Sequence, residues 1–168
     1  LWVKEHNFNR SAKRSNVMDD IRQAASSPIF VSLLILTGVA NFSVMILEPL
    51  ITIYVKGLGV SSSSASLSAG IVFSAVGVAT LIMAPRWGKI GSRIGFGKVL
   101  LIGLIGSGIG NILQFLLENI WGFGMLRFGY GLFFAAVMPS INALIVRVTP
   151  SEFRGRAFGL NQSASQIA

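Results

Sequence analysis

The sequence has 168 residues, of which 52% are hydrophobic and only 12% are charged, whereas soluble domains average about 25% charged residues. Its formal net charge is +8, but the Lys and Arg residues cluster between long apolar runs, so membrane topology explains the charge better than nucleic-acid binding. The sequence contains no cysteine, which excludes disulfides and cysteine-based metal sites, and its one histidine, His6, lies in a polar stretch.

The first 27 residues are polar and basic, and we expect them to form a cytoplasmic linker. Val17, Ile21 and Ala24 recur at helical spacing within this linker. Two interpretations stay open, a short helix that lies on the membrane surface and a solvated segment. Because the sequence begins and ends within apolar runs, we expect it to be an internal fragment of a larger membrane protein.

Long runs without a charged residue follow this linker, and a membrane-spanning helix needs about 20 mostly apolar residues. Every backbone polar group must be paired inside lipid, so these runs are predicted to be helices. Ser27 before Pro28, and Thr149 with Glu152, are typical of helix starts. The predicted spans are residues 28–55, 65–85, 99–117 and 120–146, followed by a fifth that begins near residue 150.

Lys and Arg residues occur mainly in alternate connections between these spans. Twelve of the 14 lie in residues 1–27, 86–98 and 147–156, while Lys56 lies in an opposite connection and Arg127 lies within a span. Because the cytoplasmic loops of membrane proteins are enriched in Lys and Arg, we expect those three segments to face the cytoplasm.

Two ionisable residues, Glu48 and Arg127, lie within predicted spans, where such residues usually face a cavity or a partner. Each lies about 10 Å from the outer end of its helix, so we expect the two to interact across a central cavity. Polar residues share a helix face with one or the other: Thr37, Asn41, Thr52 and Asn142. Two alternatives remain open, in which Glu48 is a solvated helix end and Arg127 is a structural or snorkelling residue.

The stretch GLIGSGIGN, residues 103–111, invites comparison with a dinucleotide-binding loop. Asn111 stands where the third glycine is required, and the stretch lies inside a charge-free run. Small residues spaced four apart, such as Gly106 and Gly110, are typical of helix packing in membranes. The sequence shows no catalytic triad, phosphate loop or metal cluster, so we expect neither an enzyme nor a bound cofactor.

The stretch GKIGSRIGFGK resembles the short cytoplasmic loop signature of the major facilitator superfamily, which reads roughly G-x-x-x-D-R-x-G-R-K/R. Gly88, Arg93 and Gly95 match this signature, Lys98 supplies a nearby cation, and Ser92 stands at the acidic position. The stretch LRFGYGLFFAAVMPSINALI is similar to the fourth or tenth helix of the family. TPSEFRGRAFGLNQSASQIA is similar to the start of the fifth or eleventh helix.

This resemblance implies an all-α polytopic membrane protein, here most of one six-helix half of a twelve-helix transporter. The likeness is greatest to bacterial multidrug efflux members, so it implies a multi-pass protein of the bacterial cytoplasmic membrane. It implies secondary transport by alternating access, with efflux of amphipathic or cationic drugs driven by a proton gradient and no cofactor. The implied partners are the small-molecule substrate, the lipid bilayer and the first six-helix half of the same chain.

The resemblance also implies that the signature residues form a cytoplasmic gating loop: Gly88, Ser92, Arg93, Gly95 and Lys98. The two helices that carry Glu48 and Arg127 would line a central cavity, so these two residues and the polar residues on their helix faces are the predicted substrate and proton pathway. Two alternatives to drug efflux stay open. One is a sugar or metabolite carrier of the same superfamily, and the other is a non-transporting membrane module that needs a partner chain.

Overall fold

The described part of the chain is helical. The computed structural model describes residues 22, 26–57, 62–114 and 116–167, without the side chains of residues 48, 52, 55, 56, 62–66 and 69. The described residues form six α-helices and one short 3₁₀ helix, and contain no strand. This confirms the expected all-α fold class. The surface helix considered for residues 1–27 lies almost wholly outside the described residues.

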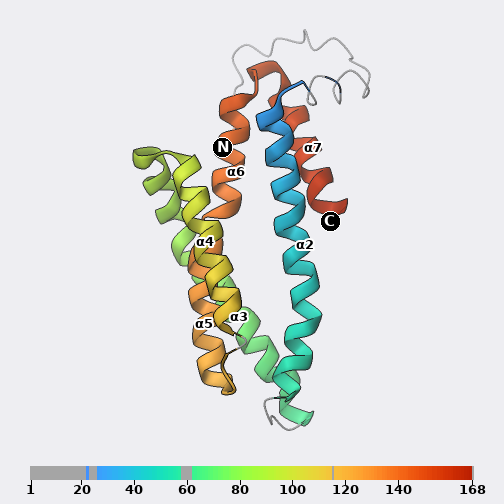
Figure 1. Cartoon of the computed structure of the whole chain (residues 1–168), viewed down its shortest axis with the longest axis vertical. Coiled ribbons are helices and arrows are strands. Elements are labelled where there is room, and N and C mark those ends of the chain that lie inside the picture. The colour runs from blue at the N-terminus through green and yellow to red at the C-terminus, as the bar shows by residue number, and fades with distance from the viewer. Residues whose placement is uncertain (1–21, 23–25, 58–61, 115, 168) are drawn as a thin grey trace, which may run out of the picture.

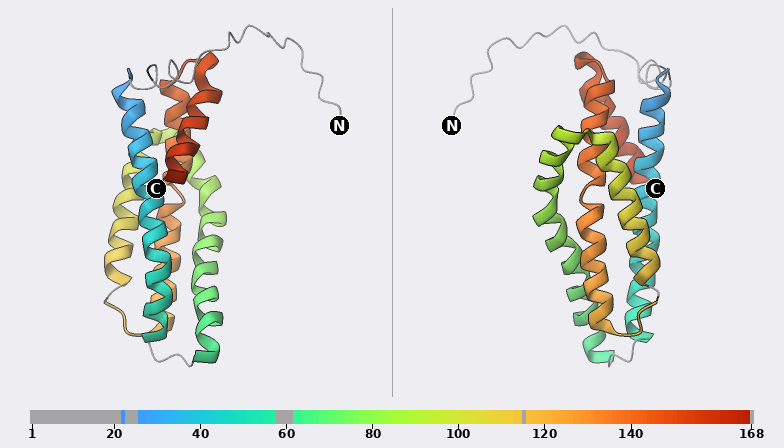
Figure 2. Two further views of the ribbon diagram at one scale, coloured as in Figure 1. Left: turned by 90° about the vertical axis from the view of Figure 1, so that its right-hand side faces the viewer. Right: turned by 60° about the vertical axis from the view of Figure 1, so that its left-hand side comes forward.

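The helices run up and down a bundle, in which α5 and α6 follow one another in the same direction (Figure 1). Their bounds are α2 Pro28–Gly57, α3 Ser62–Ile94, α4 Phe96–Gln114, α5 Ile120–Phe134, α6 Val137–Val148, η1 Ser151–Phe153 and α7 Arg154–Ile167. The start of α2, the α3–α4 turn and the α6–α7 connection lie towards one end of the bundle (Figures 1 and 2). Within the described residues, four stretches are long and apolar enough to cross a membrane: Pro28–Ile51, Gly70–Ile94, Phe96–Gln114 and Ile120–Val148.

Two helix starts have contrasting caps. At the start of α2, the Ser27 hydroxyl accepts a hydrogen bond from the backbone N–H of Phe30 at 3.4 Å, as a capping serine should. The helix-start signal of Thr149 with Glu152 does not produce a side-chain cap, because η1 has no capping hydrogen bond from a side chain. Thr149 ends α6 with the extended backbone that a residue before proline favours.

The basic stretch that was expected to be a loop is largely helical. Helix α3 continues as far as Ile94, and only Gly95 separates it from α4. Cations at the edge of a membrane do not break the backbone hydrogen bonds of a helix, so the charges alone could not mark its end. Gly95 has a φ of 95°, a conformation that glycine adopts without the penalty of a Cβ atom.

The fourth predicted span is divided into α5 and α6 at Ala135 and Ala136. Pro139 has no backbone N–H, so the carbonyl of Ala135 loses its usual helical donor. The N–H of Ala136 bonds the nearer carbonyl of Phe133 at 3.0 Å. Helix α2, in contrast, continues through Pro49.

Glycines let α5 lie close to α3 and α4. A Cβ atom on Gly131 would stand 2.9 Å from the Cβ of Ala79 and 3.0 Å from the Cα of Val76, both in α3. On the α4 side, Cβ atoms on Gly103 and Gly106 would stand under 3.0 Å from side chains of the α5–α6 span. The four-residue spacing predicted packing, and the glycine-rich stretch of α4 is indeed a contact surface for the next span.

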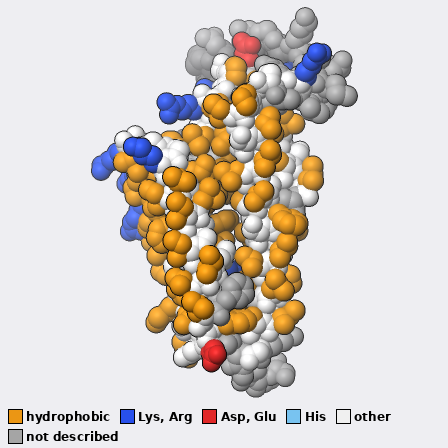
Figure 3. All heavy atoms as spheres, in the orientation of Figure 1, with side chains coloured by type: hydrophobic (Ala, Val, Ile, Leu, Met, Phe, Trp, Pro, Cys, Tyr) orange, Lys and Arg blue, Asp and Glu red, His pale blue; other side chains and the backbone are white. Residues whose placement is uncertain are grey.

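Buried apolar side chains join α2, α4, α6 and α7 near the end that carries the α3–α4 turn. The buried members of this core are Phe30, Leu33, Ala40, Leu100, Val137, Ile141, Ile145, Phe153 and Ala157. Many other apolar side chains are exposed, and they cover most of the face that Figure 3 shows. A lipid-facing surface requires this distribution, because lipid tails are as apolar as the side chains they contact.

Candidate functional site

Arg127 lies within the α5–α6 span and is only 5% exposed. Its Nη1 donates a hydrogen bond to Oε1 of Gln114 in α4 at 3.2 Å. Its guanidinium carbon lies 5.1 Å from the centre of the Tyr130 ring. A buried charge is costly without such partners, so these contacts help to hold the cation inside the span.

The orientation of Gln114 follows from its other contacts. Its amide nitrogen donates to the carbonyl oxygen of Gly110 at 3.0 Å and to Oδ1 of Asn111 at 3.2 Å. Both partners are acceptors, so the amide oxygen of Gln114 is the atom turned towards Arg127. The sequence analysis missed Gln114. A usable signal was present, because an uncharged amide in a charge-free span needs a hydrogen-bond partner as a charged group does.

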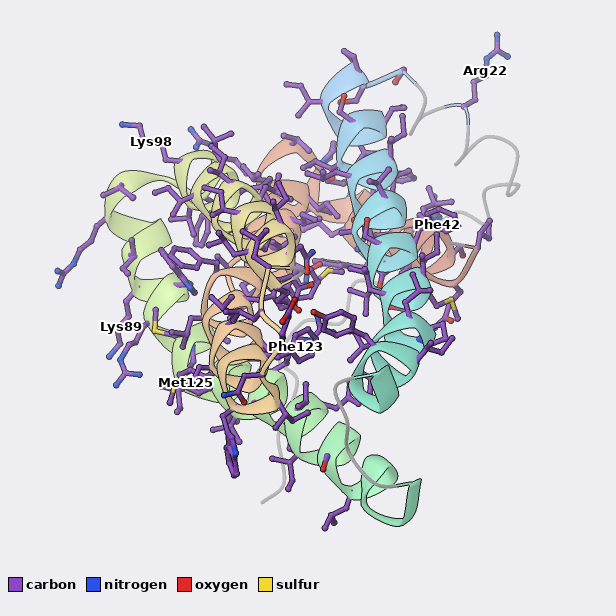
Figure 4. The ribbon with its side chains drawn as sticks, turned by 60° about the horizontal axis from the view of Figure 1, so that its bottom comes forward. Arg22, Phe42, Lys89, Lys98, Phe123 and Met125 are labelled. Atoms are coloured by element: carbon purple, nitrogen blue, oxygen red, sulfur yellow. The ribbon has the colours of Figure 1, made fainter. Side chains whose placement is uncertain are left out.

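Two cavities share Arg127 as a lining residue. The larger, of about 240 Å³, is lined by Val44 and Leu47 of α2, Phe73, Val76 and Gly77 of α3, and Arg127, Tyr130 and Phe134 of α5. The smaller, of about 20 Å³, is lined by Leu47, Leu50, Ile51 and Tyr54 of α2, Asn111 and Gln114 of α4, and Phe123 and Arg127 of α5. Phe123 points into the bundle in Figure 4. The guanidinium therefore lies in a mainly apolar and aromatic setting between α2, α4 and α5.

The side chains of Glu48 and Thr52 lie outside the described residues, although the backbone of both belongs to α2. Leu47 directly precedes Glu48 and lines both cavities. Ile51 directly precedes Thr52 and lines the smaller one. The backbone thus places both predicted residues on the stretch of α2 that lies across from Arg127.

Thr37 and Asn41 lie nearer the other end of α2. The hydroxyl oxygen of Thr37 lies 3.0 Å from the carbonyl oxygen of Leu33 and 2.7 Å from Oδ1 of Asn161 in α7. One hydroxyl proton serves only one acceptor at a time, so a flipped Asn161 amide that donates to Thr37 would satisfy both groups. Asn41 donates to the carbonyl oxygen of Thr37 at 2.8 Å.

The predicted polar residues therefore divide into separate places. Thr37 is 1% exposed and contacts α7, Asn41 is half-buried beside it, and Asn142 of α6 is exposed. None of these three lines either cavity beside Arg127. Asn161, a partner of Thr37, was not singled out in the sequence.

The predicted gating residues surround the α3–α4 turn. Arg93 and Lys98 are exposed, and the Ser92 hydroxyl donates to the carbonyl oxygen of Lys89 at 2.8 Å. A Cβ atom on Gly88 would meet nothing within 4 Å, so the described chain leaves the surface beside this glycine open.

An apolar groove of about 350 Å³ lies between α3 and α5, away from Arg127. Its lining residues are Ser68, Ile71, Val72, Ala75, Ile120, Trp121, Gly124, Met125 and Phe128. Met125 points away from the bundle in Figure 4. The described residues contain no group of three or more His, Cys, Asp or Glu side chains suited to a metal ion.

Comparison with known proteins places this arrangement in a family. Residues 33–168 match the family model of the Major Facilitator Superfamily. The chain is 31% identical to the Multidrug resistance protein MdtG of Enterobacter lignolyticus (strain SCF1) over 99% of its own length and 40% of that protein. It is also 31% identical to the protein of the same name from Salmonella arizonae, again over 99% of its length and 42% of the relative.

The chain thus spans about two fifths of the length of these relatives. The matched residues include all four stretches that could cross a membrane except the first few residues of α2. The family match covers far more than half of the chain. The helices described above, four stretches of which could cross a membrane, agree with this match. The chain belongs to the major facilitator superfamily.

Proposed function

We propose that the complete protein is a proton-coupled secondary transporter that exports amphipathic or cationic drugs by alternating access. This chain would supply most of the second six-helix half. The observation that carries the proposal is the buried cation of Arg127, which lines two largely apolar cavities across from the stretch of α2 that bears Glu48. Relatives that are named multidrug resistance proteins support the substrate class.

In this mechanism Glu48 carries the coupling proton or contacts a cationic substrate, and Arg127 interacts with it. An ionisable residue inside a membrane protein is expensive and is usually placed at an ion or substrate pathway. A neighbouring cation favours the charged carboxylate and burial favours the neutral acid. Two opposing influences of this kind let a carboxyl group bind and release a proton during a transport cycle. Thr52 would line the same pathway.

The α3–α4 turn is proposed to contact the first half of the protein on the cytoplasmic side. The open surface beside Gly88 and the tight turn at Gly95 support this placement. Lys98 would supply a cation there, Arg93 of the predicted gating loop would lie beside this contact, and Ser92 replaces the acidic residue of the family signature. Exposed cations at one end of the bundle support this orientation in the membrane. They flank the α3–α4 turn and the α6–α7 connection: Arg86, Lys89, Arg93, Lys98, Arg147 and Arg154. Residues 1–27, 86–98 and 147–156 would then be cytoplasmic in a bacterial cell membrane.

A sugar or metabolite carrier is the alternative within the superfamily. Such a site would need several paired polar groups to bind hydroxyls, whereas the larger cavity is lined mainly by aliphatic and aromatic side chains. Asn142 and Asn41 lie away from it, although both would be available to a pathway formed with the first half. The apolar lining therefore favours lipophilic substrates.

The test is transport by the full-length protein in membrane vesicles with an imposed pH gradient, followed with a lipophilic cationic dye. We expect Glu48→Gln to abolish proton-driven dye movement, because an amide cannot exchange the coupling proton. Glu118→Gln is the matched control, since Glu118 is exposed in the connection between α4 and α5. Wild-type rates for Glu48→Gln at every pH would remove Glu48 from coupling. No dye movement by the wild-type protein, with uptake of a sugar instead, would favour the alternative carrier.

A further inference from the structure

Three faces can be distinguished at the end of α3 that precedes the α3–α4 turn. One faces inward, where Trp87 is 9% exposed and donates from its indole nitrogen to the carbonyl oxygen of Leu132 at 2.7 Å. Gly91 belongs to the same face, because a Cβ atom there would collide with the Phe96 ring. The other two faces are turned away from the described bundle, and their side chains differ in kind.

The second face is small and uncharged. It carries Gly88, which has open space beside it, and Ser92, whose hydroxyl bonds its own helix. A surface of glycine and serine lets another helix approach closely. This is the face that carries the acidic position of the family signature, and it suits protein contact.

The third face, which we call the cationic face, carries Arg86, Lys89 and Arg93. At 3.6 residues per turn the three lie within about 60° of one another, and their centre lies about 110° from that of Gly88 and Ser92. All three are exposed, and together with Ile90 they line a hollow of about 260 Å³. Figure 4 shows Lys89 pointing away from the bundle.

The described chain offers no anion to these cations. Acidic residues with described side chains are Glu118, in the α4–α5 connection, and Glu152, in η1, and neither forms an ion pair with the cationic face within the described residues. The one hydrogen bond from its guanidinium groups that the structure records runs from Nη1 of Arg86 to the carbonyl oxygen of Ile82 at 2.8 Å. Most of the N–H donors of the face therefore have no acceptor within the described residues.

Exposed apolar side chains continue the cationic face towards the middle of the membrane. Ile82 is 43% exposed and Val78 is 51% exposed, and both lie on the same side of α3 as the cations. Cations at the edge of an apolar stripe match the layout of a phospholipid, whose phosphate lies above its acyl chains. Basic clusters at the cytoplasmic end of membrane helices attract anionic lipids by this complementarity.

We propose that the cationic face of α3 is a binding site for the headgroup of an anionic phospholipid. Its phosphate would contact Arg86, Lys89 and Arg93 while its acyl chains lie along Ile82 and Val78. The proposal goes beyond the transport function and does not depend on which substrate is carried. It also separates these cations from the neighbouring small face, which we assign to contact with the rest of the protein.

The experiment compares lipid retention by the full-length protein in detergent micelles doped with phosphatidylglycerol or phosphatidylcholine, measured by native mass spectrometry. We expect the wild-type protein to retain phosphatidylglycerol preferentially. The triple variant R86Q/K89Q/R93Q should lower that preference at least about fivefold, the factor expected for loss of one cation near a lipid surface.

The matched control, K98Q/R147Q/R154Q, removes three exposed cations from the same end of the bundle but not from this face. It should keep the preference. Equal losses in both triple variants would show that the lipid is attracted to the whole basic surface, which would overturn the proposal of a specific site. Unchanged lipid preference in both variants would also overturn it.

A lower melting temperature of R86Q/K89Q/R93Q in lipid-free micelles, with unchanged lipid retention, would assign the face to acidic groups of the same protein and overturn the proposal. An unchanged elution volume in size-exclusion chromatography should accompany each variant. Lipid retention is measured without transport. A negative result in the efflux test of the proposed function would therefore not affect the interpretation of the lipid measurement.

Discussion

Two sides of helix α5 differ in how they pack. On the sides that face α3 and α4, glycines bring backbones together, and a Cβ atom at Gly131, Gly103 or Gly106 would lie under 3.0 Å from a neighbour. On the side that faces α2, large side chains leave two cavities beside Arg127. Small residues therefore bring α3 and α4 close to α5 at these positions, although an apolar groove opens between other residues of α3 and α5. The cavities beside Arg127 separate α5 from α2, and α3 also lines the larger one.

The comparison suggests that the two sides of α5 have different roles. Close backbone packing resists change, because interiors at this density transmit strain and do not deform. Cavities beside a charged side chain leave room for a substrate or for movement of α2. Stability should depend on the glycine side of α5, and transport on the side that bears Arg127. Each prediction below tests one side against the other.

The largest expected loss of stability comes from Gln114, which belongs to the packed α4 but serves the charged side of α5. In Gln114→Leu, Nη1 of Arg127 loses its described acceptor while the charge stays buried, so we expect a loss of about 2–3 kcal/mol in the free energy of unfolding. SDS titration of the full-length protein in mixed micelles measures this change. Gln162→Leu, at an exposed position of α7, is the control and should change little.

Gln114→Glu sharpens that test, because it restores an oxygen for Arg127. We expect it to recover part of the lost stability. Its carboxylate gives Arg127 a charged acceptor, but its second oxygen replaces the amide donor beside the acceptors of Gly110 and Asn111. If Gln114→Leu were as stable as the wild type, the hydrogen bond to Arg127 would contribute nothing and the charge would be stabilised elsewhere.

Gly131 tests the packed side directly. Gly131→Ala inserts a methyl group against the backbone of α3, which must move, and we expect a net loss of about 1–2 kcal/mol. Gly129→Ala is a matched control two residues away, where a Cβ atom would meet nothing within 4 Å. Alanine is the better helix former, so the control should be neutral or slightly stabilised. Equal effects of both substitutions in the SDS titration would contradict the close approach of α3 and α5.

Much of this architecture follows from the sequence, for a physical reason. Charge-free runs predicted the spans because a backbone in lipid must pair its polar groups internally. The same reasoning located Arg127, since a charge within such a run is conspicuous. Charge did not reveal the end of α3, because cations at a membrane boundary leave helical hydrogen bonds intact and only Gly95 turns the chain.

The site was harder to predict than the spans. Helical periodicity grouped Thr37 with Glu48 on one face of α2, but it could not show that Thr37 meets Asn161 of α7. Gln114 carries no charge and lies in a different helix from Arg127, so its role depends on how α4 packs against α5. Contacts of this kind depend on tertiary packing, which a single sequence without related sequences does not specify.

The smallest expected effect concerns the contact between α2 and α7, which lies outside the comparison of the two sides of α5. Thr37→Val keeps the shape of the side chain but removes the hydroxyl that bonds Asn161, and polar contacts between membrane helices average only about 0.6 kcal/mol. Ser43→Ala is the control, because the Ser43 hydroxyl donates only to the carbonyl of Val39 in its own helix, at 2.8 Å.

A measurable loss of stability in Thr37→Val but not in Ser43→Ala would show that α7 is held to α2 by this hydroxyl. Equal stability of both variants would leave apolar packing of η1 and α7, through Phe153 and Ala157 in the buried core, as the main attachment. In that case α7 could slide along α2 without breaking a specific bond. The polar contact would then guide the position of α7 without fixing it. The alternating access that we propose for the complete protein would have a use for such a contact.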